Sequence, residues 1–314
     1  MTLLRLLTLV CFSSLALHSV FAEEVRVATW PEYGKNAGLV LAQVNGNFEK
    51  VGIDLKLIDT FQNGLVLLEG GAADAAQVFC SAAMTSIRNG MKAKIVAARD
   101  QRSPVATVSL PKSNIKVPAD YAGKRWGHSA GFSPEKSMLA RLLSDAGSKI
   151  DSVDLINVDF PARLPALLAG EVDFVSAWRG SGLPVVVAAA RNNGQTLDVV
   201  RWDKFGVDAY GECFVVKVDE NGEPPAWITR FLSAARAGYA ASVKDPAAAL
   251  KAVSAMPKAG DPALLSIAVE EGNELLISEG QSISDILSVT PEGLSRTASW
   301  AGLPQGGVVD MIAQ

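Results

Sequence analysis

The stretch GLVLLEGGAADAAQVF at residues 64–79 returns in altered form as LPALLAGEVDFVSAW at residues 164–178. Both copies contain Leu-Leu-x-Gly, ending at Gly70 and Gly170, and in both an Asp a few residues later opens an apolar run. A glycine just past a helix supplies the left-handed conformation that ends many helices, and a short apolar run bounded by turn residues is typical of a buried strand. Each copy therefore predicts a helix that ends at its glycine and leads directly into a strand.

The residues before each copy extend this pattern to a strand–helix–strand unit. Residues 24–29 and 53–58 alternate as strands do, and residues 36–50 between them carry apolar side chains at helical spacing. A second unit begins with a strand at 124–126, and a strand at 153–158 precedes the second copy. Strand–helix–strand units build parallel sheets, and two copies are too few for a solenoid. The sequence predicts an α/β protein with two lobes of similar build.

Residues 1–22 have the features of a secretory signal peptide. Arg5 precedes an apolar run over 6–17, and Val20-Phe21-Ala22 forms a cleavage site before acidic residues. The run is shorter than the roughly 20 apolar residues that a membrane anchor needs. We expect cleavage after Ala22 and a periplasmic mature protein.

The charge and the counts of reactive residues restrict the chemistry. The chain has 29 basic and 33 acidic residues, which gives no support for a nucleic-acid partner. Removing the signal peptide removes His18 and Cys11, so the mature chain keeps His128, Cys80 and Cys213. These are too few for an ordinary zinc site or a Ser-His site, and neither a P-loop nor a dinucleotide fingerprint occurs. We expect no metal, no cofactor and no catalytic residue.

The two mature cysteines leave two alternatives open. Export makes a disulfide between Cys80 and Cys213 possible. A bridge needs a Cα separation below about 7 Å, which a sequence does not give. The alternative is a pair of buried thiols.

Several polar and aromatic residues follow predicted strands, where open α/β sheets bind their ligands. Trp30 and Tyr33 follow the first strand and can stack on a planar group, or can cover a core edge. Cys80 and Ser81 open the helix after the first copy, and their amides and hydroxyl can meet an anion or form a plain helix cap.

The second unit offers a matching set of candidates. His128, Ser129 and Phe132 lie in the glycine-containing loop before a predicted helix, and the histidine either donates to a ligand or is an ordinary loop residue. Trp178 and Arg179 follow the second copy. An arginine there suits a carboxylate, sulfonate or phosphate, and the alternative is a surface arginine beside a packing tryptophan.

The whole set of segments, taken in order, resembles the extracytoplasmic substrate-binding proteins of ABC importers. Within them it resembles the family of nitrate, taurine, alkanesulfonate and thiamine-precursor binders. The matching segments cover nearly all of the mature chain: residues 30–52, both Leu-Leu-x-Gly units, Asp120-Tyr-Ala-Gly-Lys-Arg-Trp-Gly127, Tyr210-Gly211 and Asp245-Pro-Ala-Ala-Ala249. The resemblance implies the type II fold of periplasmic binding proteins, in which each lobe has a mostly parallel sheet flanked by helices.

The resemblance also implies a domain division and a function. Lobe 1 is expected at residues 23–107 plus 208–314 and lobe 2 at 108–207, with chain crossings near 106–110 and 205–213. Glu212, near the second crossing, is then a further ligand-binding candidate, and the alternative is an ordinary core or surface residue. The implied function is noncatalytic capture of a small organic anion or heterocycle in the interlobe cleft. A monomer would deliver this ligand to an ABC-transporter permease in the membrane.

Two other functions and two ligand classes stay open. One branch of the family resembles thiamine-pyrimidine synthases, which carry a cysteine-rich motif, whereas Cys80 stands alone in Val-Phe-Cys-Ser. A ligand sensor that reports to a membrane receptor would differ only in its partner. Cleft aromatics with Arg179 favour a flat ligand that bears an acidic group. The competitor is a pyrimidine-like heterocycle held by Trp30, Tyr33 and a carboxylate.

Overall fold

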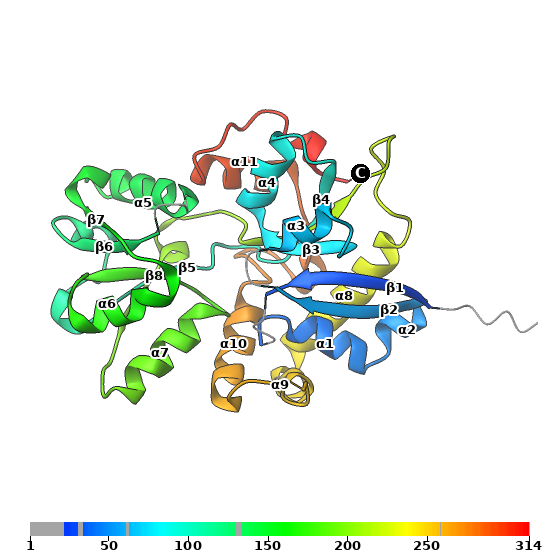
Figure 1. The fold of residues 1–314 in the computed structure, drawn as a ribbon, viewed down its shortest axis with the longest axis horizontal. Helices are drawn as coiled ribbons and strands as arrows, with labels where there is room; N and C mark the ends of the chain where they lie inside the picture. Colours follow the sequence, from blue (N-terminus) through cyan, green and yellow to red (C-terminus); the bar gives the residue numbers. More distant parts are fainter. Residues whose placement is uncertain (1–21, 31–33, 61–62, 130–132, 258, 314) are drawn as a thin grey trace, which may run out of the picture.

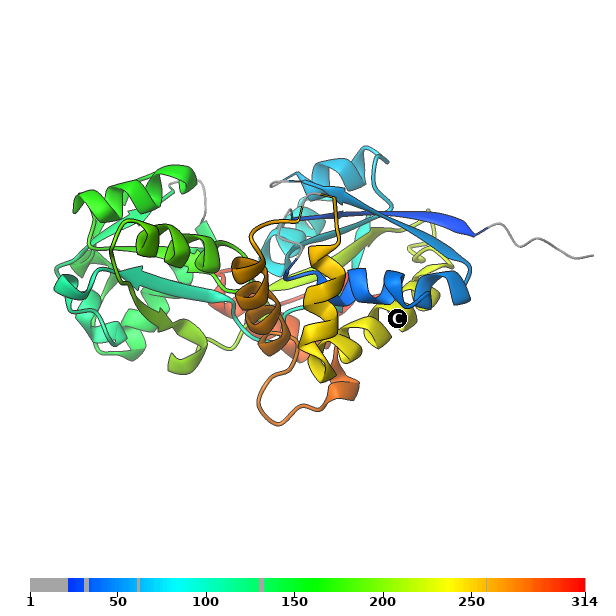
Figure 2. The ribbon, with the colours of Figure 1, turned by 90° about the horizontal axis from the view of Figure 1, so that it is seen from below.

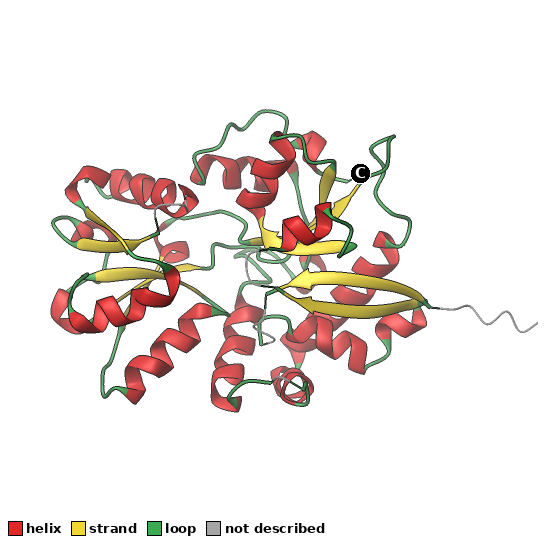
Figure 3. Cartoon of the chain, viewed as in Figure 1, coloured by secondary structure: helices red, strands yellow, loops and turns green. Residues whose placement is uncertain are grey.

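The computed structural model describes residues 22–30, 34–60, 63–129, 133–257 and 259–313. The predicted signal peptide up to Phe21 and the candidates Tyr33 and Phe132 lie outside these residues. The chain forms two lobes side by side, each with one sheet flanked by helices (Figure 1; Figure 3). The predicted α/β fold with two lobes is confirmed.

The sheet of lobe 1 has the strand order β2-β1-β3-β10-β4. The first three strands of the order run parallel, whereas β10 is antiparallel to both of its neighbours. Because β10 comes from late in the sequence, lobe 1 is built from two separate parts of the chain. The strands are β1 (Glu23–Thr29), β2 (Ile53–Asp59), β3 (Ala75–Phe79), β4 (Ala93–Ala98) and β10 (Glu212–Lys217).

The sheet of lobe 2 has the order β7-β6-β8-β5-β9, which matches lobe 1 position by position. Here too the first three strands of the order are parallel, and β5 is antiparallel to its neighbours. The repeated sequence therefore corresponds to a repeated sheet. The strands are β5 (Val105–Ser109), β6 (Arg125–His128), β7 (Asp154–Asn157), β8 (Phe174–Trp178) and β9 (Asp198–Arg201).

The helices cover the faces of both sheets. Gly46, with a φ of 68°, divides the helix predicted over 36–50 into two. Of the helices near the C-terminus, α10 reaches α7 of lobe 2 where the lobes meet (Figure 2). The helices are α1 (Ala37–Val44), α2 (Asn47–Lys50), α3 (Gly64–Glu69), α4 (Cys80–Arg88), α5 (Ser133–Asp145), α6 (Arg163–Ala169), α7 (Gly182–Asn192), α8 (Ile228–Lys244), α9 (Pro246–Ser254), α10 (Pro262–Glu274) and α11 (Pro291–Trp300).

The Asp that opens each copy of the repeat makes the same contacts in both lobes. Asp74 accepts hydrogen bonds from the backbone N–H of Arg26 at 2.8 Å and from its guanidinium at 2.8 and 3.0 Å. Asp173 accepts from the backbone N–H of Arg125 at 2.8 Å and from its guanidinium at 2.9 and 3.1 Å. Each pair ties the start of β3 or β8 to the neighbouring parallel strand, so the repeat extends to individual atoms.

The glycines of the repeat behave differently in the two copies. Gly170 has a φ of 75° and ends α6 in the left-handed conformation, as predicted. Gly70 is right-handed with a φ of −73°, and Gly71 adopts the left-handed conformation instead. The prediction for Gly70 is wrong by one position, because the first copy has one more residue between its helix and its Asp.

The strands also locate the two crossings between the lobes. All of β5 pairs within the second sheet, so the first crossing precedes Val105, and the boundary expected after residue 107 would divide a strand. Val207 and Ala209 pack in a lobe 2 core, whereas Tyr210 packs in a lobe 1 core. The second crossing therefore lies at Ala209–Tyr210, within the expected 205–213.

Candidate functional site

A cavity of about 800 Å³ lies between the lobes at the carboxyl ends of the parallel strands. Lobe 1 contributes residues at or just after the ends of β1, β2 and β3 together with the start of β10, and lobe 2 contributes residues at or just after the ends of β6, β7 and β8. This is the edge at which open α/β sheets bind ligands. Its aromatic and polar lining comprises Trp30, Thr60, Gln77, Phe79, Ser129, Glu135, Asn157, Asp159, Phe160, Arg163, Trp178, Ser181 and Glu212.

Aromatic rings run across the cavity from one lobe to the other. The ring centroids of Trp30 and Phe79 are 5.2 Å apart, and those of Phe79 and Trp178 are 4.1 Å apart. Phe160 adds a half-exposed ring on the lobe 2 side. Rings of this kind offer flat apolar surface, so the cavity suits a ligand with a planar body.

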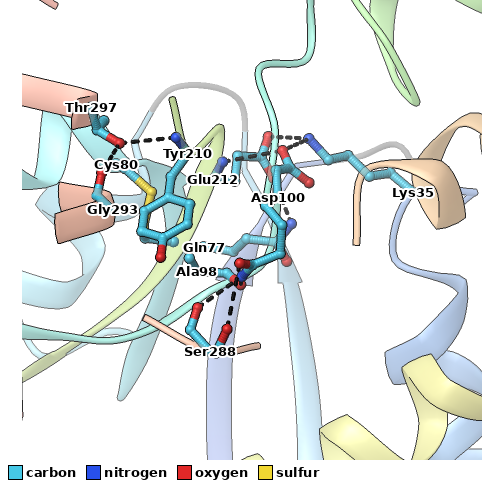
Figure 4. Close-up of a disulfide and its surroundings, with 12 residues drawn as sticks. Lys35, Gln77, Cys80, Ala98, Asp100, Tyr210, Glu212, Ser288, Gly293 and Thr297 are labelled. Carbon is cyan, nitrogen blue, oxygen red and sulfur yellow. Dashed lines mark hydrogen bonds and ion pairs between the residues drawn. A yellow bond between two sulfur atoms is a disulfide. The ribbon is translucent and has the colours of Figure 1, made fainter. Parts of the chain in front are cut away.

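Glu212 supplies a buried carboxylate on the lobe 1 side. It pairs with Phe79 in the β10–β3 register and is 2% exposed. Its Oε2 accepts from Nε2 of Gln77 at 2.6 Å, and its Oε1 lies 3.0 Å from Nζ of Lys35 (Figure 4). A carboxylate can accept about four hydrogen bonds, so these two contacts leave acceptor capacity for a ligand N–H.

Lys35 connects Glu212 to a second buried ion pair. Its Nζ lies 2.9 Å from Oδ2 of Asp100 (Figure 4). Oδ1 of Asp100 lies 2.5 Å from Nη1 of Arg99. Burial alone would raise the pKa of Asp100, but the charges of Lys35 and Arg99 outweigh it and lower that pKa below its usual value. Two cations and two carboxylates thus balance at the base of the cleft, which is why these charges tolerate burial.

Cys80 and Cys213 form a disulfide with a Cα separation of 5.0 Å, which decides between the two alternatives (Figure 4). Both residues are 0% exposed, and Cys80 is not among the residues that line the cavity. Its sulfur is therefore unavailable to a ligand. The bridge instead fixes the end of β3 to β10 beside Phe79 and Glu212, which do line the cavity.

A cluster of polar residues forms the lobe 2 wall. Oε1 of Glu135, near the start of α5, accepts from the indole Nε1 of Trp178 at 3.0 Å. Its Oε2 lies 3.3 Å from Nη2 of Arg163, the first residue of α6, and 3.7 Å from Nδ1 of His128. The same Nη2 lies 3.3 Å from Oγ of Ser129. These contacts hold Trp178 in place and leave Arg163 paired with a carboxylate.

The structure brings part of the predicted set together. Trp30, Ser129, Trp178 and Glu212 line one cavity. Ser81 and His128 lie behind its walls, with exposures of 6% and 5%. The imidazole of His128 stacks on the indole of Trp126, with ring centroids 4.3 Å apart.

Arg179 faces away from the cavity, against the expectation that it would grip an acidic ligand. Its guanidinium is 1% exposed and lies 3.6 Å from Asp203 and 3.7 Å from Glu271, and it also contacts Glu274. Glu271 further accepts from the backbone N–H of Gly180 at 3.0 Å. Carboxylates of this chain therefore occupy Arg179, two of them from α10 across the lobe boundary.

Sequence reasoning missed several residues of the cavity, namely Gln77, Phe79, Glu135, Asp159, Phe160 and Arg163. Gln77 carried a signal, because it is a polar residue inside the apolar run of the first copy. Glu135 and Arg163 begin helices on opposite sides of β7 in the sequence, and no spacing rule links them.

A family model described as NMT1/THI5 like matches residues 34–249. The chain belongs to this family. A curated relative from Haemophilus influenzae, provisionally named a thiamine biosynthesis protein, is 28% identical over 238 residues, which cover 74% of this chain and 73% of the relative.

Solved structures show the same fold as this NMT1/THI5-like protein. The periplasmic aliphatic sulphonate binding protein SsuA from Escherichia coli superposes with a TM-score of 0.69 at 16% identity, over 93% of this chain and 92% of SsuA. The desulfurization enzyme DSZB superposes with a TM-score of 0.61 at 16% identity, over 93% of this chain and 96% of DSZB. The fold is thus that of periplasmic binding proteins, and it also occurs in an enzyme. In the described part of the chain, no helix is long and apolar enough to span a membrane.

Proposed function

We propose that this protein is a periplasmic solute-binding protein that holds a planar amino heterocycle of the pyrimidine type in its interlobe cavity. A monomer would release the ligand unchanged to an ABC importer in the membrane. The observation that carries the proposal is the composition of the cavity, where aromatic rings adjoin the carboxylates of Glu212 and Asp159.

The charges of the cavity favour a heterocycle with N–H groups over an organic anion. Glu212 and Asp159 offer acceptors, and Arg163 is paired with Glu135. Arg179, the group expected to bind an acid, contacts carboxylates of α10 instead. A ligand that donates hydrogen bonds and stacks on rings matches these surfaces better than a sulfonate or carboxylate does.

The comparisons support transport more than catalysis, and they support this ligand class. SsuA is a periplasmic binding protein. The relative from H. influenzae is named for the biosynthesis of thiamine, and thiamine is a vitamin that contains an aminopyrimidine ring. An enzyme remains the second candidate, because DSZB shares the fold. The disulfide argues against a thiol nucleophile, because it joins Cys80 and Cys213. A sensor would share the cavity and differ in its membrane partner.

Thermal unfolding of the mature protein with a panel of ligands tests the ligand class. At 100 times its dissociation constant, a ligand adds about 2.7 kcal/mol to the free energy of unfolding. We expect 4-amino-2-methylpyrimidine to raise the transition temperature, and benzenesulfonate, benzoate and nitrate to leave it unchanged. A shift with the anions and none with the pyrimidine would contradict the proposal.

Phe160→Ala tests whether the aromatic lining binds the ring. Loss of one stacking ring costs about 1–3 kcal/mol, so we expect the pyrimidine affinity to fall at least about fivefold. Val309→Ala is the matched control, because Val309 is an exposed apolar residue that does not line the cavity. Equal affinities of the two variants, measured by titration calorimetry, would place the ligand elsewhere.

A further inference from the structure

The lobe 2 wall of the cavity contains one buried pair of opposite charges. The side chains of Glu135 and Arg163 are 1% and 6% exposed, and both residues line the cavity. Arg163 is the single cation among the described lining residues. The remaining carboxylates of the lining, Glu212 and Asp159, belong to the lobe 1 base and to the loop after β7.

Glu135 is placed to cancel the charge of Arg163. The two groups are 3.3 Å apart, Oε2 to Nη2, in a wall from which water is largely excluded. Other donors of Arg163 are also engaged, since Nη1 lies 3.3 Å from the carbonyl of Ser176 and Nη2 lies 3.3 Å from Oγ of Ser129. A guanidinium that is paired in this way offers little net attraction to a second anion.

Glu135 has a second contact, with Trp178, that does not depend on its negative charge. Its Oε1 accepts from Nε1 of Trp178 at 3.0 Å, and a glutamine at this position would keep that acceptor and nearly the same volume. Glu135→Gln therefore removes the charge while it preserves the position of the indole. Arg163 would then be a buried cation without its ion-pair partner.

We propose that Glu135 determines ligand specificity by charge: it neutralises Arg163 and thereby excludes organic anions from the cavity. This inference rests on the proposed function, because it explains how the fold that binds sulfonates in SsuA would hold a neutral heterocycle here. Removal of Glu135 converts the wall to an anion-attracting surface. Removal of Arg163 leaves Glu135 uncompensated and favours cations.

Two probes with the same ring and opposite charge, benzenesulfonate and benzamidine, test the proposal. We expect Glu135→Gln to raise the affinity for benzenesulfonate relative to benzamidine at least about tenfold over the wild type. Arg163→Gln should shift the same ratio at least about tenfold in the other direction. The double variant Glu135→Gln/Arg163→Gln should return near the wild-type ratio, because it removes both charges.

Circular dichroism shows which variants fold. If one single variant does not fold, the affinity ratio of the other still tests the proposal, because the two are expected to shift the ratio in opposite directions. A ratio unchanged within about twofold in a folded single variant, or no binding of either probe to any variant, overturns the proposal. Failure of the proposed function gives a different result. In that case the wild type binds no aminopyrimidine, whatever the charge preference of the variants.

Discussion

Asp173 accepts hydrogen bonds from the guanidinium and the backbone N–H of Arg125. The side-chain hydrogen bonds are the largest cause that lowers the pKa of its carboxyl below the usual value, and burial opposes them. A carboxyl with a lowered folded pKa stabilises the fold above its unfolded pKa of about 3.9, and this stability is lost as the pH falls through the folded pKa.

Asp173→Asn should therefore lower the free energy of unfolding at pH 7 by about 0.5–1 kcal/mol, a modest effect because the pair is partly exposed to solvent. The difference from the wild type should shrink toward zero as the pH falls through the lowered folded pKa, below which the unfolded and folded carboxyls are both protonated. Urea unfolding at several pH values measures it, with the exposed Asp151→Asn as control. A difference that does not depend on pH would contradict the assignment.

Neighbouring residues at the end of one strand show how far sequence reasoning reaches at the residue scale. Both Trp178 and Arg179 follow a strand; Trp178 lines the cavity, whereas Arg179 contacts Glu271 of α10. Successive side chains of an extended chain point to opposite sides, so a strand end presents only some of its residues to the ligand. Glu135 was missed because its role depends on Arg163, and their contact exists only in the folded lobe.

The elements were largely predictable from the sequence because the repeat fixes both their order and their type. The strands that carry the cavity follow the apolar runs of the two copies, β3 and β8. The antiparallel pairing of β10 and β5 was harder to predict, because their partner strands are distant in sequence and no local pattern encodes that pairing. The register of β10 against β3 is what brings Glu212 beside Phe79.

The disulfide holds these two strands together at the cavity. Cys80 and Cys213 are 133 residues apart in sequence, so the bridge closes a long loop in the unfolded chain. We expect reduction, or the double variant Cys80→Ala/Cys213→Ala, to lower the free energy of unfolding by about 2–4 kcal/mol. Guanidinium unfolding with and without reductant measures the effect, and the double variant must not respond to reductant. Coincident curves for the oxidised and reduced wild type would sink this prediction.

At the scale of the molecule, the lobes meet through the ion cluster around Arg179 as well as through the two crossings. Glu271 and Glu274 of α10 contact this guanidinium from lobe 1, and Glu274 also lies 3.0 Å from Nη1 of Arg201. Burial is the largest influence on Glu271 and raises the pKa of its carboxyl, although Arg179 opposes it. The cluster therefore links the relative position of the lobes to a buried cation.

Arg179→Met should loosen the lobes, not remove a ligand contact. Loss of one partner from a buried ion pair costs about 3–5 kcal/mol, so we expect a clear loss of stability and a larger radius of gyration in small-angle X-ray scattering without ligand. Arg191→Met, at an exposed position on α7, is the control. An unchanged radius of gyration and stability, together with abolished ligand binding, would contradict this prediction and indicate that Arg179 contacts the ligand.

The two-lobe arrangement itself was predictable, because the sequence contains the repeat twice and the lobes share one strand order. The contents of the cleft were only partly predictable, since residues from many separate strand ends and helix starts converge there. The sequence favoured an aromatic acid, whereas the position of Arg179 is the reason that we propose an amino heterocycle.

Equilibrium dialysis of the mature protein against 4-amino-2-methylpyrimidine, followed by mass spectrometry of the retained ligand, tests the central claim most directly. We predict that one equivalent is retained per chain and that it is recovered with its mass unchanged. Retention of no pyrimidine, or recovery of a chemically altered product, would contradict a protein that captures this ligand class and releases it intact.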